Sequence, residues 1–421
     1  MTENHQEMLK HHIWANAVTM TREPSGILGH PYLVPATPDS VYYSADLWDW
    51  DSWFISVALG QLEVDTGREG DFFRYEAGCV LNFLDHADHG VVPIKLDPTG
   101  ELRHERIVGS DYATGQNTHK PVLAQHAALI TQRRSDVSWL ADGLGRIGEF
   151  LLQYLTVHTH QPTGLAYWQT DFAVGVDNDP SVFYRPDRSC ASIYLNSLLH
   201  RELLAYAYLL TQAGRPDEAG LWHRRAEDLA TAVRRHCWDE RDGTFYSVDL
   251  ALRTVDQTDW LHRGAPRSWD CLLLRIDSWS SFLPLWSGIA TPDQAARMVE
   301  RLNDPRTFRA RFGVRTLSAL EKQYNLAATN NPSNWLGPVW GISNYLVYRG
   351  LQRYGHTADA DQLARATVEL FGDDLAAHGC LHEYYDPDTG APIMTPGFQN
   401  WNYLVLNMIA HLEGRRVVTE F

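Results

Sequence analysis

Two kinds of helical segment alternate along the sequence from about residue 120 onward, and this alternation constrains the fold more than any other feature. Residues 193–210 and 342–351 are apolar almost all round. Residues 222–233 and 357–371 instead combine an apolar stripe with charged positions. A helix that is apolar on every side is buried, whereas an amphipathic helix covers a core with one face only. Two concentric helix layers satisfy both requirements. The sequence therefore predicts an all-α fold, an α/α barrel built from helical hairpins.

The connections between the helical segments indicate one domain with a cleft. No Pro/Ser-rich linker, low-complexity tract or charge run interrupts residues 1–421, and strand signals are confined to short pieces such as residues 244–248. We therefore expect a single domain. Long connections in a compact fold are usually functional, and in an α/α barrel they gather at one end, so we expect a cleft there. The long connections are residues 42–53, 111–121, 167–188, 330–341 and 379–401.

Composition excludes several classes of partner. The formal net charge is -16, which argues against a nucleic-acid or anionic-membrane surface because such surfaces need clustered cations. The five cysteines form no C-x-x-C pair, the N-terminus lacks the pattern of a signal peptide, and no apolar run reaches the roughly 18 residues of a membrane span. We expect a cytoplasmic protein that acts on a small molecule, with homo-oligomer formation left open.

Aromatic residues indicate what that small molecule is. The chain has 15 Trp and 19 Tyr, and many of them stand beside Asp, Asn, Gly and Pro rather than inside clean apolar periods. Aromatic planes pack against the C–H faces of sugar rings, while charged and amide groups bind the hydroxyls. For any single tryptophan, a place in the core is the alternative. The pattern as a whole favours a sugar-binding cleft.

The run Trp48-Asp49-Trp50-Asp51-Ser52-Trp53 is the first candidate for a site. Three tryptophans at this spacing cannot share one helical face, so some of them point into a cleft or an interface. An aspartate between tryptophans offers an acceptor for neighbouring hydroxyls beside a stacking surface. The alternative is a helix N-terminus, where Asp is a good cap.

Two further segments carry carboxylates in unusual surroundings. Asp177 stands in the turn Gly175-Val176-Asp177-Asn178-Asp179, where nearby carboxylates raise a pKa and suit it to a general acid, although a purely structural turn is the alternative. Glu383 stands among aromatic residues and could direct a water as a base, or be held by backbone donors alone. Residues 386–390 match half of a calcium loop, D-x-D-x-G, but lack the closing glutamate, so we expect a tight turn there.

Together these segments resemble glycoside hydrolase family 63, in the expected order from about residue 42 to 401. The related trehalases carry similar strings. The matching strings here are Trp50-Asp51-Ser52-Trp53, His119-Lys120-Pro121 with Ala124-Gln125, Gly175-Val176-Asp177-Asn178, Phe282-Leu283-Pro284-Leu285-Trp286, Asn334-Trp335-Leu336-Gly337-Pro338-Val339-Trp340 and Glu383-Tyr384-Tyr385-Asp386.

The resemblance implies an (α/α)6 barrel and an inverting hydrolase that needs neither a cofactor nor a metal. It assigns the general acid to Asp177 and the general base to Glu383. The first sugar subsite that it implies consists of Trp50, Asp51, Trp335, Trp340 and Gln399. Inversion requires the two carboxyl groups to lie roughly 6.5–9.5 Å apart, which leaves room for the attacking water.

Within the family, the chain looks most like the bacterial mannosylglycerate and glucosylglycerate hydrolases. That likeness implies a polar pocket for the glycerate carboxylate. Trp48, in the tryptophan-rich run, is a further candidate for substrate binding. The candidates for the pocket are Tyr42, Tyr43, Gln125, Arg185 and Arg188. Arginine suits a carboxylate because its guanidinium donates two parallel hydrogen bonds.

Three alternatives remain open from the sequence. One is an α-glucosidase acting on short oligosaccharides. A second is a sugar isomerase or epimerase of the α/α barrel class, which would need two convergent histidines such as His382 with His119 or His126. A third is a sugar-binding protein without turnover.

Overall fold

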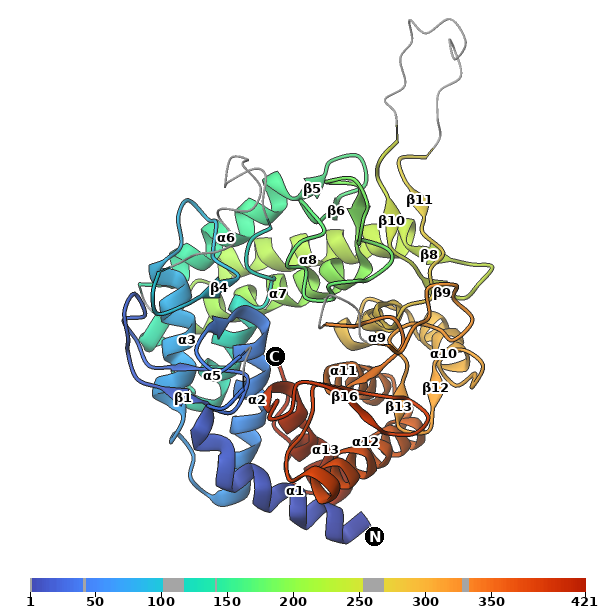
Figure 1. Ribbon diagram of the computed structural model, residues 1–421. Coiled ribbons are helices and arrows are strands. Elements are labelled where there is room, and N and C mark those ends of the chain that lie inside the picture. The colour runs from blue at the N-terminus through green and yellow to red at the C-terminus, as the bar shows by residue number, and fades with distance from the viewer. Residues whose placement is uncertain (1, 41–42, 101–116, 141, 253–268, 328–332) are drawn as a thin grey trace, which may run out of the picture.

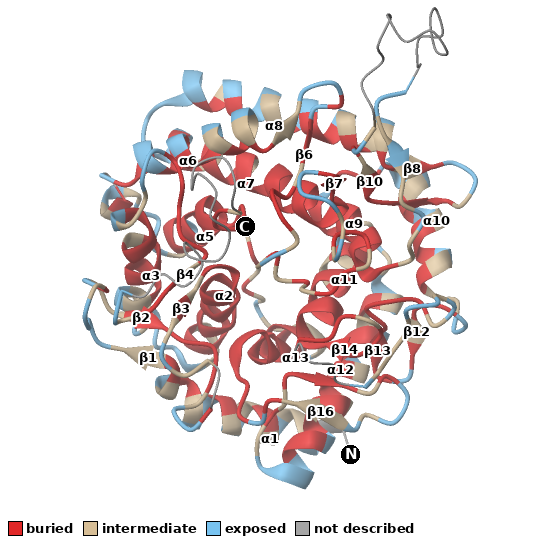
Figure 2. Ribbon diagram, turned by 45° about the horizontal axis from the view of Figure 1, so that its top comes forward, coloured by how far each residue is buried: buried red, intermediate tan, exposed pale blue. Residues whose placement is uncertain are grey.

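The computed structural model describes residues 2–40, 43–100, 117–140, 142–252, 269–327 and 333–421. Helices form a closed ring around a central axis (Figure 1). An inner layer is buried nearly all round, and an outer layer exposes one face (Figure 2). The all-α fold class predicted from the alternating helical segments is confirmed.

The inner helices contact one another in sequence and then close the circle. Along the chain each contacts the next, and the last, α13, returns to α2. Their bounds are α2 Asp49–Thr66, α5 Leu123–Arg134, α7 Ile193–Gln212, α9 Leu283–Ser287, α11 Gly341–Arg353 and α13 Val405–Leu412. This order of contacts is the arrangement that an α/α barrel requires.

The outer helices cover the inner layer. Their bounds are α1 Thr2–Asn16, α3 Phe73–Asp85, α6 Leu144–Val157, α8 Pro216–His236, α10 Pro292–Leu302 and α12 Thr357–His378. Helix α8 buries the stripe that contains Trp222, Ala226, Leu229 and Val233, while its charged residues face solvent. The amphipathic pattern therefore places this helix correctly in the outer layer.

Some helix bounds differ from those that the periodicity predicts. Helix α12 runs to His378 rather than ending near residue 371, and a 3₁₀-helix over Asn400–Leu404 precedes α13. Residues 49–53 belong to the first turns of α2 instead of a loop. The remaining 3₁₀-helices are η1 Ala17–Met20, η2 Ser138–Leu140 and η3 Trp279–Phe282, and the one before α13 is η4.

The strands are short and lie in the connections. Three of them, β14 Val339–Trp340, β15 Tyr384–Tyr385 and β16 Pro392–Met394, form an antiparallel sheet in the order β14-β15-β16. The others are β1 Thr21–Arg22, β2 Tyr32–Leu33, β3 Leu47–Trp48, β4 Lys95–Leu96, β5 Thr159–His160, β6 Leu165–Ala166, β7 Cys190–Ala191, β8 Trp238–Asp239, β9 Thr244–Phe245, β10 Val248–Asp249, β11 Leu272–Leu273, β12 Arg309–Ala310 and β13 Gly313–Val314. These pieces fix the loops at the end of the barrel.

Many large aromatic side chains are buried, among them Trp53, Trp279 and Trp286. Trp53 packs against Phe54 and Trp286 and takes no part in a cleft.

All five cysteines are free thiols. Among the described helices, none combines the length and apolar character needed to cross a membrane. The C-terminal residue lies near the middle of the ring in both views (Figures 1 and 2).

Candidate active site

A cavity at one end of the barrel collects residues from all five long connections. Carboxylates, aromatic rings and one lysine make up most of its wall. The lining residues are Tyr43, Trp48, Trp50, Asp51, Ile94, Lys120, Ala173, Gly175, Asp177, Ser333, Trp335, Trp340, Glu383, Phe398 and Trp401. Segments far apart in sequence therefore meet around a single cleft.

Neighbouring side chains in the acidic turn between β6 and β7 make different contacts. Asn178 accepts a hydrogen bond from the backbone N–H of Trp335 at 2.7 Å, and Asp179 accepts from both the N–H and the hydroxyl of Ser181. These two side chains hold the turn together. Asp177, which lies between Val176 and Asn178, is left to face the cavity.

Gly175 permits the close approach that brings this turn to the cavity wall. Its φ of +90° is a conformation that residues with a Cβ adopt at a cost. A Cβ at this position would lie 2.5 Å from Cε of Lys120 and 3.0 Å from the ring of Trp50. A glycine is therefore required here for both conformation and space.

The carboxyl group of Asp177 is removed from bulk solvent. This burial raises the pKa of Asp177 above its usual range, and it outweighs the opposing effects of the Lys120 charge and of a hydrogen bond from Ser333. A raised pKa favours the protonated form, which a general acid needs at the start of a reaction.

Glu383 directly precedes β15 and is held on both oxygens. Tyr43 donates its hydroxyl to Oε1 at 3.2 Å, and Thr395 donates to Oε2 at 2.6 Å. Burial raises the pKa of Glu383 to about 7; the hydrogen bonds oppose this shift and the charge of Asp177 adds to it. The electrostatic coupling between Asp177 and Glu383 is consistent with two carboxyl groups that face one cavity.

The two aspartates at the start of α2, Asp49 and Asp51, make different contacts. Asp49 binds Nζ of Lys120 at 3.0 and 3.1 Å and accepts the N–H of the same residue, so it anchors the lysine beneath the cavity. Asp51 lines the cavity and accepts a hydrogen bond from Asn400. Burial and the neighbouring Asp49 raise the pKa of Asp51 to about 8, against the opposing charge of Lys120.

Stacked aromatic rings form one wall of the cavity. The rings of Trp335 and Trp340 stack with centroids 4.0 Å apart and planes within 9°. Tyr384 extends the stack beyond Trp340 at 4.7 Å. Trp401 meets Trp50 edge to face at 5.2 Å. Sequence analysis did not single out Trp401, although it stands between Asn400 and Asn402, the kind of neighbours that favour a cleft aromatic.

Several residues predicted for the site lie elsewhere. Gln125 is buried within α5, where its amide donates to the carbonyls of Pro121 and Leu198. Gln399 pairs with the hydroxyl of Thr19 behind the cavity wall. Neither side chain lines the cavity.

The predicted arginines also lie outside the cavity. Arg185 forms an ion pair with Asp249 at 2.6 Å, and Arg188 is exposed. Both remain in the loop that carries Asp177, but their side chains are not among those that line the cavity. Tyr42 lies outside the described residues.

Sequence reasoning also missed the roles of Lys120 and Ser333. Lys120 stood in a string that matched the family, but its role was not visible because its partner Asp49 is 71 positions away. Ser333 donates to Asp177 and accepts from Nε1 of Trp335 at 2.9 Å, and a serine among loop residues carries no signal of such a role.

Comparison with known proteins identifies the family. The family model described as "Mannosylglycerate hydrolase MGH1-like glycoside hydrolase domain" matches residues 43–401. The chain belongs to this glycoside hydrolase family. Mannosylglycerate hydrolase MGH1 of Selaginella moellendorffii is 32% identical over 82% of this chain and 76% of its own length.

Other relatives are longer proteins. A probable trehalase of Eremothecium gossypii is 27% identical over 89% of this chain and 55% of its own length. A mannosylglycerate hydrolase of Rubrobacter radiotolerans is 27% identical over 47% of this chain and 39% of its own length. The chain thus spans about half the length, or less, of these curated relatives.

Solved structures share the fold. The crystal structure of the GH63 mannosylglycerate hydrolase of Thermus thermophilus in complex with glucose superposes with a TM-score of 0.68 at 20% identity. The match covers 94% of this chain and 99% of that one. Neutral trehalase Nth1 of Saccharomyces cerevisiae gives a TM-score of 0.60 at 17% identity, over 90% of this chain and 74% of that one. The resemblance to glycoside hydrolase family 63 seen in the sequence is confirmed.

Proposed function

We propose that the protein is an inverting α-glycoside hydrolase that cleaves a small glycoside such as mannosylglycerate or glucosylglycerate. One observation carries the proposal. Two buried carboxyl groups with raised pKa values, Asp177 and Glu383, line one cavity together with a stack of tryptophans. Sugar binding alone gives no reason for such a pair.

In this mechanism the two carboxyl groups share one proton at the start. Because both pKa values are raised and the groups interact, the pair retains a proton close to neutral pH. The productive form has the proton on Asp177. Asp177 gives it to the glycosidic oxygen as the bond from that oxygen to the anomeric carbon breaks.

Glu383 acts on the opposite face of the sugar. Its ionised form accepts a proton from a water molecule whose oxygen bonds to the anomeric carbon. Tyr43 and Thr395 each donate a hydrogen bond to one oxygen of Glu383 and fix the direction of the carboxylate. Protons balance, because Asp177 loses one and Glu383 gains one before they exchange with solvent.

The rest of the cavity suits the binding of one sugar ring. Trp50, Trp335 and Trp340 give the cavity an apolar aromatic lining for C–H groups, and Asp51 offers acceptors to hydroxyl groups. Lys120 is the cation among the described lining residues, and Asp49 holds it in place.

The glycerate part of the proposal is supported by the names of the Selaginella and Rubrobacter relatives. The trehalase relatives support the second candidate, an α-glucosidase that acts on short α-linked sugars. The free cysteines support a cytoplasmic location.

Initial rates on mannosylglycerate, glucosylglycerate, trehalose and maltose separate the glycerate candidate from the α-glucosidase candidate. The glycerate candidate predicts a kcat/KM at least tenfold higher for mannosylglycerate or glucosylglycerate than for the other two sugars.

An isomerase is less well supported. His119, His126 and His382 do not line the cavity. Burial lowers the pKa of His119 to about 4 and that of His126 to about 3, so both are neutral, and each already has a hydrogen-bond partner. No convergent pair of histidines faces the cavity in the described part of the chain.

The assignment of the two catalytic residues is tested by Asp177→Asn and Glu383→Gln. Each removes a proton donor or acceptor without a change of size, so kcat should fall by about 10² or more while the protein stays folded. Asp187→Asn is the matched control, since this carboxylate lies in the same loop but is exposed. Activity within threefold of the wild type in either cavity variant would show that the assignment is wrong.

A further inference from the structure

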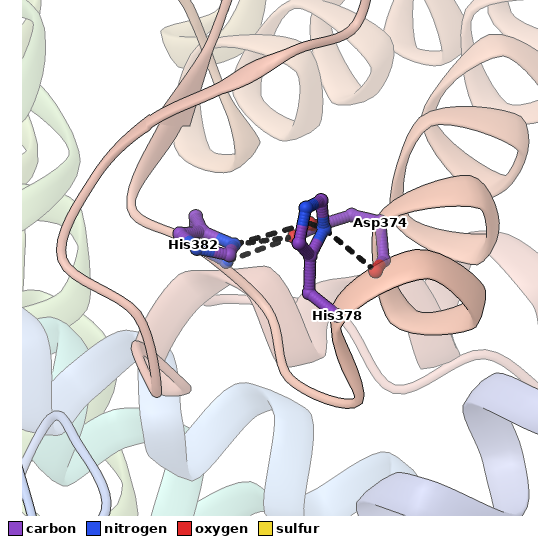
Figure 3. A group of neighbouring side chains, drawn as sticks. All are labelled: Asp374, His378 and His382. Atoms are coloured by element: carbon purple, nitrogen blue, oxygen red, sulfur yellow. Dashed lines mark hydrogen bonds and ion pairs between the residues drawn. The ribbon is translucent and has the colours of Figure 1, made fainter.

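A second group of polar side chains lies outside the cavity, where α12 ends and β15 begins. Asp374 lies on α12, His378 is the last residue of that helix, and His382 comes just before β15 (Figure 3). Nδ1 of His378 is 2.8 Å from Oδ1 of Asp374, and Nδ1 of His382 is 3.0 Å from the same oxygen. Both imidazoles therefore point at one carboxylate oxygen.

The backbone explains why these residues meet. Asp374 and His378 are four positions apart and share one face of α12. Gly379 then ends the helix with a φ of +72°, and the chain turns back so that His382 returns to the same place. The convergence thus depends on a helix repeat followed by a tight turn.

Other groups fix the orientation of the carboxylate. The hydroxyl of Tyr385 and the backbone N–H of His382 donate to Oδ2 of Asp374 at 2.8 and 3.0 Å. Outer groups of this kind orient the ligands of metal sites.

Exposure increases across the group, which leaves one side open to solvent. The side chain of Asp374 is fully buried, that of His382 is 14% exposed and that of His378 is 44% exposed. A cavity with a volume of about 390 Å³ borders His382 and is also lined by Asp39 and Ser40. A small ion and its water ligands can reach the group by this route.

We propose that Asp374, His378 and His382 bind a divalent transition-metal ion of the Zn²⁺ type. Their ligand atoms lie within 4.8 Å of one another. Two imidazoles and one carboxylate suit Zn²⁺, with the remaining position open to water. Ligands about 2.0–2.1 Å from such an ion lie roughly 3.3 Å apart, so the exposed His378 needs to move by only a few tenths of an ångström.

The site is separate from the proposed hydrolysis, which uses none of its three residues. It is nevertheless next to the catalytic machinery in sequence, because His382 directly precedes Glu383. Thr395, which donates to Glu383, lines the cavity beside His382. A bound ion therefore connects the end of α12 to the segment that carries the general base.

The test is cobalt and zinc binding by the full chain after treatment with a chelator. Co²⁺ should bind with about one equivalent and give the intense visible d–d absorption of a four-coordinate site, and Zn²⁺ should displace it. Isothermal titration with Zn²⁺ measures the affinity directly. Mg²⁺, which prefers an all-oxygen octahedral site, should give no heat.

Variants distinguish this site from other surface histidines. His378→Ala should weaken binding at least tenfold and remove the absorption, and His378→Gln should behave in the same way if the alanine variant does not fold. His30→Gln is the matched control, because His30 also pairs with one carboxylate, Asp85 at 3.0 Å, and it should leave binding unchanged. Absence of the absorption in the wild type, or equal binding by wild type and both His378 variants, would overturn the proposal.

Discussion

At the scale of single residues, the burial of one carboxylate and the hydrogen bonds to it set the pH dependence expected of the proposed hydrolysis. Glu383 has a pKa of about 7 because burial outweighs the donors Tyr43 and Thr395. The Glu383 general base acts only when ionised, so we expect kcat/KM to rise with pH along an acidic limb near pH 7. Asp177 is the proposed acid of the turn, since hydrogen bonds hold the side chains of its neighbours Asn178 and Asp179.

Tyr43→Phe tests whether the hydrogen bond from Tyr43 lowers the pKa of Glu383. The Tyr43 hydroxyl stabilises the ionised form of Glu383 from 3.2 Å, so its loss raises the pKa of Glu383 further. The acidic limb of kcat/KM should then move to higher pH. The measurement is a pH–rate profile, with Tyr75→Phe as the control because the Tyr75 hydroxyl pairs with Glu23 at the surface. A limb that stays in place or moves to lower pH would contradict the role given to Tyr43.

At the scale of elements, the side chain of Asn178 joins the turn that carries Asp177 to the segment that carries Trp335. Asn178 accepts the backbone N–H of Trp335 and donates to Asn334, so its side chain joins the turn to the segment before β14. Asn178→Ala leaves a buried N–H without an acceptor, which costs about 1–3 kcal/mol. We expect a loss of unfolding free energy of that size in urea together with a lower kcat.

The matched control for that change is Asn303→Ala. Asn303 follows the outer helix α10 and donates to Asp359 at 2.8 Å, outside the set of cavity residues. It should lower stability without a change in kcat. If Asn178→Ala left kcat at the wild-type value, the coupling of the loop to the wall would be refuted.

Some helices and site residues could be predicted from the sequence, and others could not. Helices α7 and α8 follow from their periodicity alone, because local side-chain order decides which face is buried. Asp177 and Glu383 could be placed from their unusual neighbours and from the family resemblance. Arg185 could not be placed, because its partner Asp249 lies on a strand 64 positions away. The group around Asp374 was also missed, since it depends on how the turn after α12 returns the chain.

At the scale of the whole molecule, the C-terminal segment ties the inner helices together. Glu420 is buried, accepts hydrogen bonds from Trp286 and Tyr345, and pairs with Arg349 at 3.0 Å. Burial by itself raises the pKa of Glu420, but the charge and hydrogen bonds of Arg349 and the bond from Tyr345 outweigh it and lower the pKa below 4.5. A depressed pKa stabilises the folded state above the unfolded pKa, and this contribution is lost as pH falls through the folded value.

Glu420→Gln should therefore lower the free energy of unfolding near pH 7 by about 3–5 kcal/mol, because Arg349, whose side chain is only 17% exposed, loses its partner. The difference from the wild type should shrink as the pH falls below about 4.5. Urea unfolding at a series of pH values measures both. A difference that does not change with pH would show that the charge of Glu420 is not what stabilises the barrel.

Inversion by two carboxylates on opposite faces of a sugar is the central claim, and the anomer of the first product tests it most directly. Proton NMR can follow the newly formed sugar before mutarotation, with mannosylglycerate or glucosylglycerate as the substrate. Trehalose is unsuitable, because its leaving glucose is released as the α-anomer under either mechanism. We predict that the β-anomer appears first, because water enters the face opposite the leaving oxygen. Initial release of the α-anomer would indicate a covalent glycosyl intermediate and would contradict the roles assigned to Asp177 and Glu383.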